Sequence, residues 1–85
     1  MKYALEILRS AQKSLSTIQA ADRAKIGDAI RALADDPRPN GSRKLTAREA
    51  WRIRIGKYRV IYQIFDDRLV VYVVSIRHRK DVCRE

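Results

Sequence analysis

Apolar and charged residues alternate strictly in one short segment of the chain, 51–55. Trp51, Ile53 and Ile55 occupy every second position, and an arginine stands between each pair. This period of two predicts a strand with one buried and one exposed face. Two further apolar segments follow, rich in valine, isoleucine and tyrosine, and short polar pairs that favour turns separate them. The segments and turns in order are 51–55, Gly56-Lys57, 58–64, Asp66-Asp67 and 68–76. They predict a three-stranded antiparallel meander.

The N-terminal part of the chain begins with another alternating segment, 2–8, which we interpret as a first strand. A helix is expected directly after it, with Ser10 as the residue that caps its first turn. Three apolar residues then recur at helical spacing and define the face that packs on the sheet. They are Ala11, Leu15 and Ile18.

A second helix is predicted from Gln19 to Asp35. Ile26, Ile30 and Leu33 form its apolar stripe. Pro37 ends the helical pattern, because proline has no N–H to donate and disfavours helix at the residue before it. The segment 37–42 is then a loop. We therefore predict an α+β fold in a single domain, 1–85, in which a two-helix antiparallel hairpin packs on a small, twisted, mainly antiparallel four-stranded sheet.

The predicted hairpin at Gly56-Lys57 fixes which residues oppose one another. With a two-residue loop, Arg54 lies opposite Arg59. Arg52 lies on the same face as Arg54, two residues before it in the strand. The opposite face collects a consistent apolar set: Trp51, Ile53, Ile55, Tyr58, Val60 and Tyr62. A register shifted by one would turn an arginine into the core, so we exclude it. Like charges directly opposite each other destabilise a sheet. A bound anion, such as a phosphate, would relieve the repulsion.

Charge supports an anionic partner. The 85-residue chain carries a formal net charge of +9, and most of that excess lies in residues 43–85. A one-sided basic excess favours nucleic acid as the partner.

No apolar segment reaches the ~20 residues of a membrane span, and no secretory signal pattern is present. Cys83 is the only cysteine and His78 the only histidine, so we expect no disulfide, no metal site and no cofactor. We expect a cytoplasmic protein.

The segment after the last predicted strand is also basic. Arg77, His78, Arg79 and Lys80 stand in a row at a strand end, where loops often carry function. His78 is the only side chain whose ordinary pKa lies near neutrality. It is therefore the candidate proton shuttle among cations that stay charged.

The residues from Trp51 to Tyr62, the valine-rich strand and the run from Ile76 to Val82 together resemble the RelE/ParE superfamily of bacterial and archaeal toxins. The resemblance covers nearly the whole chain. It implies a RelE-like fold and an mRNA interferase, which is an endoribonuclease that cleaves mRNA in the ribosomal A site. The implied partners are an acidic, RelB-like antitoxin, the 70S ribosome and mRNA. A ParE-like inhibitor of DNA gyrase and a catalytically weak RNA-binding relative are the alternatives.

The resemblance also assigns roles to residues. It places Arg52, Arg54, Arg59 and Arg79 at basic positions of the family's active site, with His78 added here as the proton shuttle. RelE-like toxins often carry a tyrosine where this chain has Cys83. Cations stabilise the pentacovalent phosphorus that forms when a 2′-OH attacks its own phosphodiester, but a guanidinium is too basic to accept the proton. We further expect six residues to contact the RNA: Arg52, Arg54, Lys57, Arg59, Arg77 and Lys80.

Overall fold

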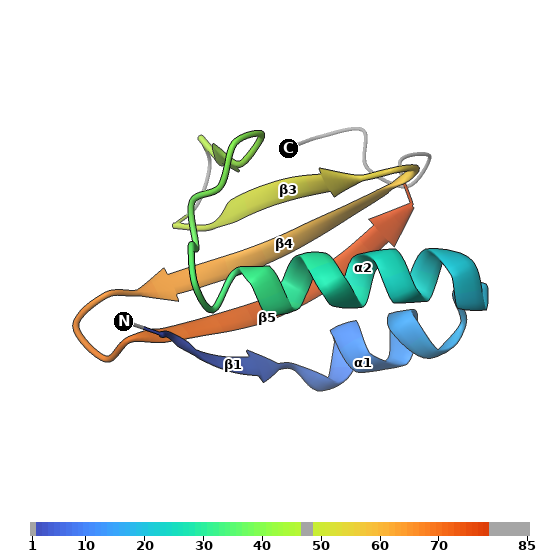
Figure 1. Ribbon diagram of the computed structural model, residues 1–85, viewed down its shortest axis with the longest axis horizontal. Coiled ribbons are helices and arrows are strands. Elements are labelled where there is room, and N and C mark those ends of the chain that lie inside the picture. The colour runs from blue at the N-terminus through green and yellow to red at the C-terminus, as the bar shows by residue number, and fades with distance from the viewer. Residues whose placement is uncertain (1, 47–48, 79–85) are drawn as a thin grey trace.

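A computed structural model describes residues 2–46 and 49–78. It contains two helices and five strands in the order β1 (Ala4–Ile7), α1 (Arg9–Ser16), α2 (Ala20–Ala32), β2 (Arg43–Lys44), β3 (Trp51–Ile55), β4 (Tyr58–Phe65) and β5 (Val70–His78). Figure 1 shows β3, β4 and β5 crossing the molecule together, with α2 lying across them and α1 beside β5. The α+β class and the mainly antiparallel sheet are as predicted.

The five strands form one sheet in the order β1-β5-β4-β3-β2. The meander from β3 to β5 is antiparallel, as predicted, and β1 runs parallel to β5 at one edge. The strand β2 was not predicted, because two residues are too few to show an alternating pattern. It pairs antiparallel with β3 at the other edge and raises the strand count from four to five.

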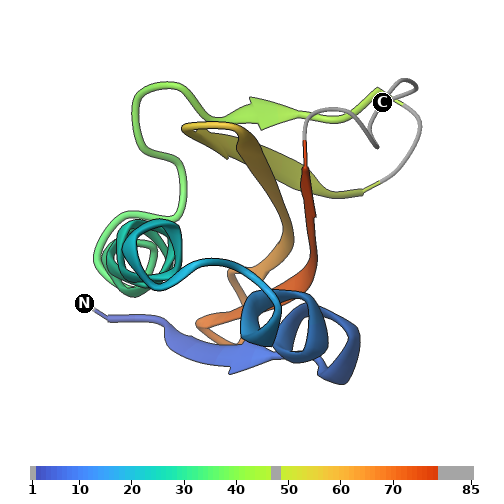
Figure 2. The ribbon, with the colours of Figure 1, turned by 90° about the vertical axis from the view of Figure 1, so that its right-hand side faces the viewer.

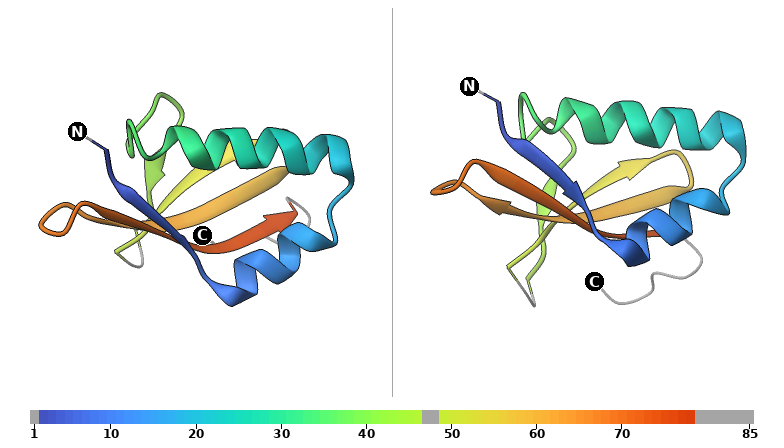
Figure 3. Two further views of the ribbon diagram at one scale, coloured as in Figure 1. Left: turned by 60° about the horizontal axis from the view of Figure 1, so that its bottom comes forward. Right: turned by 90° about the horizontal axis from the view of Figure 1, so that it is seen from below.

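Both helices pack against one side of the sheet, which curls around α2 (Figure 2). The helices diverge from the connection between them (Figure 3), so α1 lies mainly on β5 and α2 reaches β3. The core between helices and sheet is apolar, and burial of such side chains is the main stabilising term in folding. Its buried members include Ala11, Ile18, Ile26, Ile30, Leu33, Val60, Tyr62, Val71, Val73 and Ile76.

The first helix differs from the prediction at its start. Leu8, not Ser10, is the N-cap residue, and no side chain caps the helix. The Ser10 hydroxyl instead donates a hydrogen bond to the carbonyl of Val74 on β5, at 2.8 Å. Ser10 therefore joins α1 to the sheet rather than closing its first turn.

The connection between β4 and β5 also differs. The predicted two-residue turn at Asp66-Asp67 is a four-residue loop that ends at Leu69. Leu69 has φ 53, in the left-handed region, and pairing resumes between Phe65 and Val70. The last strand therefore begins at Val70 instead of Arg68. At its other end it extends to His78 instead of ending at Ile76, because Arg77 and His78 pair with Arg59 and Tyr58.

One irregularity in β5 decides which way its last residues face. Tyr62 pairs with Val73 but Ile61 pairs with Ser75, so Val74 is an extra residue in β5. Such a bulge shifts the register by one residue and exchanges the two faces of the strand beyond it. It places Ile76 in the core opposite Val60.

Candidate nucleic-acid interface

Three arginines form a row across the sheet. Arg54 of β3 is directly opposite Arg59 of β4, which is directly opposite Arg77 of β5. The residue pairs beside them, Ile53 with Val60 and Val60 with Ile76, belong to the core. Because successive strand residues point to opposite faces, the three arginines point away from the helices, onto what we call the outer face. The opposition of Arg54 and Arg59 confirms the predicted hairpin register.

The turn that joins β3 to β4 explains this register. Gly56 has φ 58, whereas Lys57 has no positive φ, which is the pattern of a type II′ two-residue hairpin loop. A glycine tolerates this conformation because it has no Cβ. Lys57 is exposed in the turn, at the same end of the hairpin as the three-arginine row.

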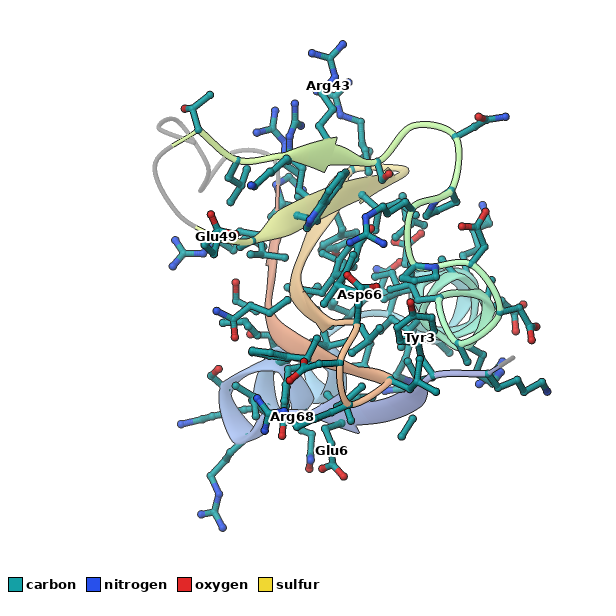
Figure 4. All side chains as sticks on the ribbon, turned by 90° about the vertical axis from the view of Figure 1, so that its left-hand side faces the viewer. Tyr3, Glu6, Arg43, Glu49, Asp66 and Arg68 are labelled. Carbon is teal, nitrogen blue, oxygen red and sulfur yellow. The ribbon has the colours of Figure 1, made fainter. Side chains whose placement is uncertain are left out.

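A second row of arginines crosses β3 two residues before Arg54. Arg43 of β2 is opposite Arg52 of β3, and Arg52 is opposite Ile61 of β4. Arg43 is exposed and reaches away from the sheet at its β2 edge (Figure 4). We call Arg43 and Arg52 the two-arginine row. Sequence reasoning missed Arg43, because β2 is too short to give a pattern.

The outer face has a small apolar cluster of its own. Leu45, Ala50 and Ile61 are buried together, separate from the main core. The Leu45 amide donates to the Ala50 carbonyl at 2.9 Å and closes the connection between β2 and β3. This cluster holds β2 and β3 together, and it accounts for a buried isoleucine on a face that the alternating pattern assigned to polar groups.

The three-arginine row lacks counter-charges among residues 2–46 and 49–78. The ion pairs in those ranges join Lys2 to Asp35, Arg31 to Asp28, Arg38 to Asp66 and Lys44 to Glu49. Arg54 and Arg77 are exposed. The Nε atom of Arg59 is buried and has no hydrogen-bond acceptor in the described part of the chain. A buried donor without an acceptor is unfavourable, and an anion bound between the guanidinium groups would supply one.

His78 does not lie with these arginines. It pairs with Tyr58, whose side chain packs against the core, so His78 points to the helix side of the sheet. The two rings meet edge to face, with centroids 5.2 Å apart. Both line a cavity of about 250 Å³ beside Ser14 and Thr17. The bulge at Val74 causes this separation, because it turns Arg77 outward and the next residue inward.

Two of the predicted site residues, Arg79 and Lys80, lie outside the described residues, as does Cys83. The structure therefore brings Arg52, Arg54, Arg59 and Arg77 onto one face, with Lys57 at its end. Within the described ranges, no group of three or more histidine, cysteine, aspartate or glutamate side chains is placed to hold a metal ion. None of the helices there is long and apolar enough to cross a membrane.

A contrasting charged site lies at the far end of β4. Asp66 accepts hydrogen bonds from the Tyr3 hydroxyl at 2.6 Å and from Arg38 Nη2 at 2.9 Å; Tyr3 and Asp66 are adjacent in Figure 4. These two donors lower the pKa of Asp66, the Arg38 hydrogen bond most. Arg38 also lies over the Trp51 ring, 5.2 Å from its centroid.

A cavity of about 380 Å³ opens beside this network, next to Lys44 and Glu49. Its two cations, Arg38 and Lys44, are both paired with carboxylates. The cavity is thus electrically balanced, unlike the three-arginine row.

Comparison with known proteins gives a consistent result. The model of the family described as the ParE toxin of the type II toxin-antitoxin system, parDE, matches residues 3–82. No curated protein matches.

Solved structures of toxins share the fold. The RelE–RelB complex from Pyrococcus horikoshii is similar over 96% of this chain and 100% of that one, with 24% identity and a TM-score of 0.85. The RelBE2 toxin–antitoxin complex from Mycobacterium tuberculosis matches over 93% and 100%, with 21% identity and a TM-score of 0.82. A mutant of E. coli RelE in the free state matches over 95% and 87%, with 24% identity and a TM-score of 0.79.

Proposed function

The chain belongs to the ParE toxin family of type II toxin–antitoxin systems, within the RelE/ParE superfamily, and we propose that it acts as a ribosome-dependent endoribonuclease. It acts in the cytoplasm, where it cleaves mRNA in the ribosomal A site and so inhibits translation. The observation that carries this proposal is the three-arginine row. Arg54, Arg59 and Arg77 stand directly opposite one another without counter-charges in the described residues.

In this mechanism the arginines act on charge. Attack by the 2′-OH on its own phosphodiester forms the bond from the 2′-oxygen to phosphorus and breaks the bond to the 5′-oxygen, leaving a 2′,3′-cyclic phosphate and a 5′-hydroxyl. The 2′-OH gives up its proton to water and the 5′-oxygen takes one from water. The attack places extra negative charge on the phosphorus oxygens, and fixed cations stabilise that charge most in the transition state. Arg54 and Arg77 approach from the open surface, and Arg59 contributes a donor already removed from water. Arg52 extends the cationic surface by one row.

The arginines do not act as the base, since a guanidinium stays protonated near neutral pH. His78 is on the helix side of the sheet, with Tyr58, so we no longer assign it the proton transfer. In this proposal the ribosome orients the 2′-OH for attack. Correct positioning of reacting groups can by itself accelerate a reaction greatly. Arg79 keeps the role that the resemblance gave it, as a further cation beside the phosphate.

The test is primer extension on mRNA from cells that express the chain. We expect cuts at codon positions, and we expect Arg54→Ala and Arg59→Ala each to remove them along with growth arrest. Arg9→Ala is the matched control. Arg9 is exposed at the start of α1, and this substitution also removes one positive charge. Growth arrest without mRNA cuts, or cuts that persist in both row variants, would overturn the proposal.

A second candidate function is inhibition of DNA gyrase. The family model that matches is named for the ParE toxin, and a gyrase inhibitor needs no proton acceptor on the outer face. A supercoiling assay with purified gyrase separates the two functions. Inhibition of supercoiling by the wild-type chain, in the absence of mRNA cuts, would favour this candidate.

We also propose an acidic, RelB-like antitoxin as the partner. Two of the similar structures are toxin–antitoxin complexes, and a net charge of +9 favours an acidic partner. Binding to the folded state would raise the melting temperature of the toxin. Co-purification with a co-encoded acidic protein tests this. A melting temperature that does not change when that protein is added would contradict it.

A further inference from the structure

We propose that the outer face binds two successive phosphates of one RNA strand, and that Arg43 holds the phosphate next to the one gripped by the three-arginine row. The RNA ligand rests on the function proposed above, and the second phosphate position goes beyond it. Arg43 would be a positioning residue for the substrate strand.

The spacing of the two rows supports this. Arg52 precedes Arg54 by two residues on β3, and strand residues rise by about 3.3 Å each, so the rows lie roughly 7 Å apart. This is close to the separation of neighbouring phosphates along an extended RNA strand. An RNA strand running parallel to β3 would therefore meet one row with each successive phosphate.

The charges in the two-arginine row repeat the arrangement of the first row. Arg43 stands directly opposite Arg52, so like charges again oppose each other across a strand pair. Arg43 is exposed, and none of the ion pairs within 2–46 and 49–78 includes it. Its neighbour Lys44 is opposite Trp51 on the other face and pairs with Glu49 at 3.4 Å. Within the described residues, the adjacent cation is thus neutralised by a carboxylate, and Arg43 is not.

The apolar cluster of the outer face keeps Arg43 in position. Leu45 packs with Ala50 and Ile61, and its amide hydrogen bond to Ala50 holds the end of β2 against β3. Arg43 therefore projects from a paired strand rather than from a free loop. Held in this way, its guanidinium loses less freedom when it binds a phosphate.

The number of phosphates in a short RNA provides the test. The probes are 2′-O-methyl oligoribonucleotides with hydroxyl ends, a dinucleotide with one phosphate and a trinucleotide with two, which the toxin cannot cleave. Affinity is measured by NMR titration of the full chain at several salt concentrations. For the wild type we expect tighter binding of the trinucleotide, with a salt dependence steeper by about 0.7 in log–log slope.

Arg43→Gln should reduce the advantage of the trinucleotide, since only Arg52 of the two-arginine row then remains, and leave the affinity for the dinucleotide unchanged. Arg43→Lys should retain most of the advantage, and Arg9→Gln is the control of equal charge on α1. An advantage as large in Arg43→Gln as in the wild type, or an equal loss for both probes, would overturn the inference. The assay needs neither ribosome nor cleavage, so it can succeed when primer extension fails, and it can fail when mRNA is cut.

Discussion

Arg54 and Arg59 are directly opposed on neighbouring strands, with Arg77 opposed to Arg59 on the next. Like charges opposite each other in a sheet destabilise it by about 0.2–1 kcal/mol per pair. The sheet thus forms despite this row, and an anion that binds there removes a repulsion as well as gaining contacts.

Arg54→Gln should therefore make the free protein more stable while it impairs function. We expect the free energy of unfolding to rise by about 0.2–1 kcal/mol at low salt, measured by urea denaturation, because one repulsive pair is removed. The gain should shrink at high salt, where exposed charges are screened. The same variant should lose mRNA cleavage. A variant less stable than the wild type at low salt would contradict the prediction.

Asp66 links three parts of the chain, and its contribution should depend on pH. The hydrogen bonds from Arg38 and Tyr3 hold the pKa of this carboxyl below its ordinary value. A lowered folded-state pKa gives stability that is complete above the unfolded pKa of about 4 and is lost as the pH falls below it. Asp66→Asn should therefore be less stable than the wild type at neutral pH.

The difference between Asp66→Asn and the wild type should disappear in acid. Urea denaturation at neutral and acidic pH measures it, and Asp67→Asn is the control, since Asp67 is exposed in the same loop. A difference that stays constant across the acidic range would show that the charge of Asp66 does not contribute.

Tyr62 should make the protein sensitive to alkali. Its side chain is fully buried, and its hydroxyl donates to the Pro37 carbonyl at 2.8 Å. Burial raises the pKa of Tyr62 from 10.0 to about 12. The neutral form is thus favoured in the folded state, so stability is complete below pH 10 and falls as the pH rises from 10 toward 12. Two pKa units correspond to about 2.7 kcal/mol.

Tyr62→Phe tests this by urea denaturation across the alkaline range. It should cost about 1 kcal/mol at neutral pH, because the Pro37 carbonyl loses its donor. Above pH 10 the wild type should lose this advantage and become the less stable of the two. Parallel losses in both proteins would locate the alkaline transition elsewhere.

The sequence predicted the hairpin of β3 and β4 well, and the reason is physical. Only one register buries Trp51, Ile53 and Ile55 together, and that register also sets Arg54 against Arg59. The alternation has a strict period of two, so a slip of one residue would bury charge. The alternating pattern within the strand and the burial of the core both select the same register for this hairpin, so either one predicts it.

The sequence was silent where long-range packing decides. Arg43 belongs to a strand of two residues, whose pairing depends on the cluster of Leu45, Ala50 and Ile61. The face of His78 depends on the extra residue at Val74, and no residue type in that strand marks a bulge. Serine favours cap positions, which predicts a cap at Ser10, but the Ser10 hydroxyl donates its hydrogen bond to β5 instead.

The bulge at Val74 is the feature on which the assembly of the three-arginine row depends. If Val74 were paired in a regular strand instead of bulged, Arg77 would turn to the core side and Ile76 to the outer face. Deletion of Val74 joins Ser75 directly to Val73, so Ile61 can still pair with Ser75 and Val60 with Ile76, now in a regular strand. The deletion should therefore keep Arg77 on the outer face and Ile76 in the core, where the loss of burial would cost about 1.5–3 kcal/mol. Val74→Ala keeps the residue count and should cost no more than about 1 kcal/mol. Urea denaturation compares both variants with the wild type. A deletion variant that loses about 1.5–3 kcal/mol more than Val74→Ala would contradict this register, because Ile76 would then have left the core.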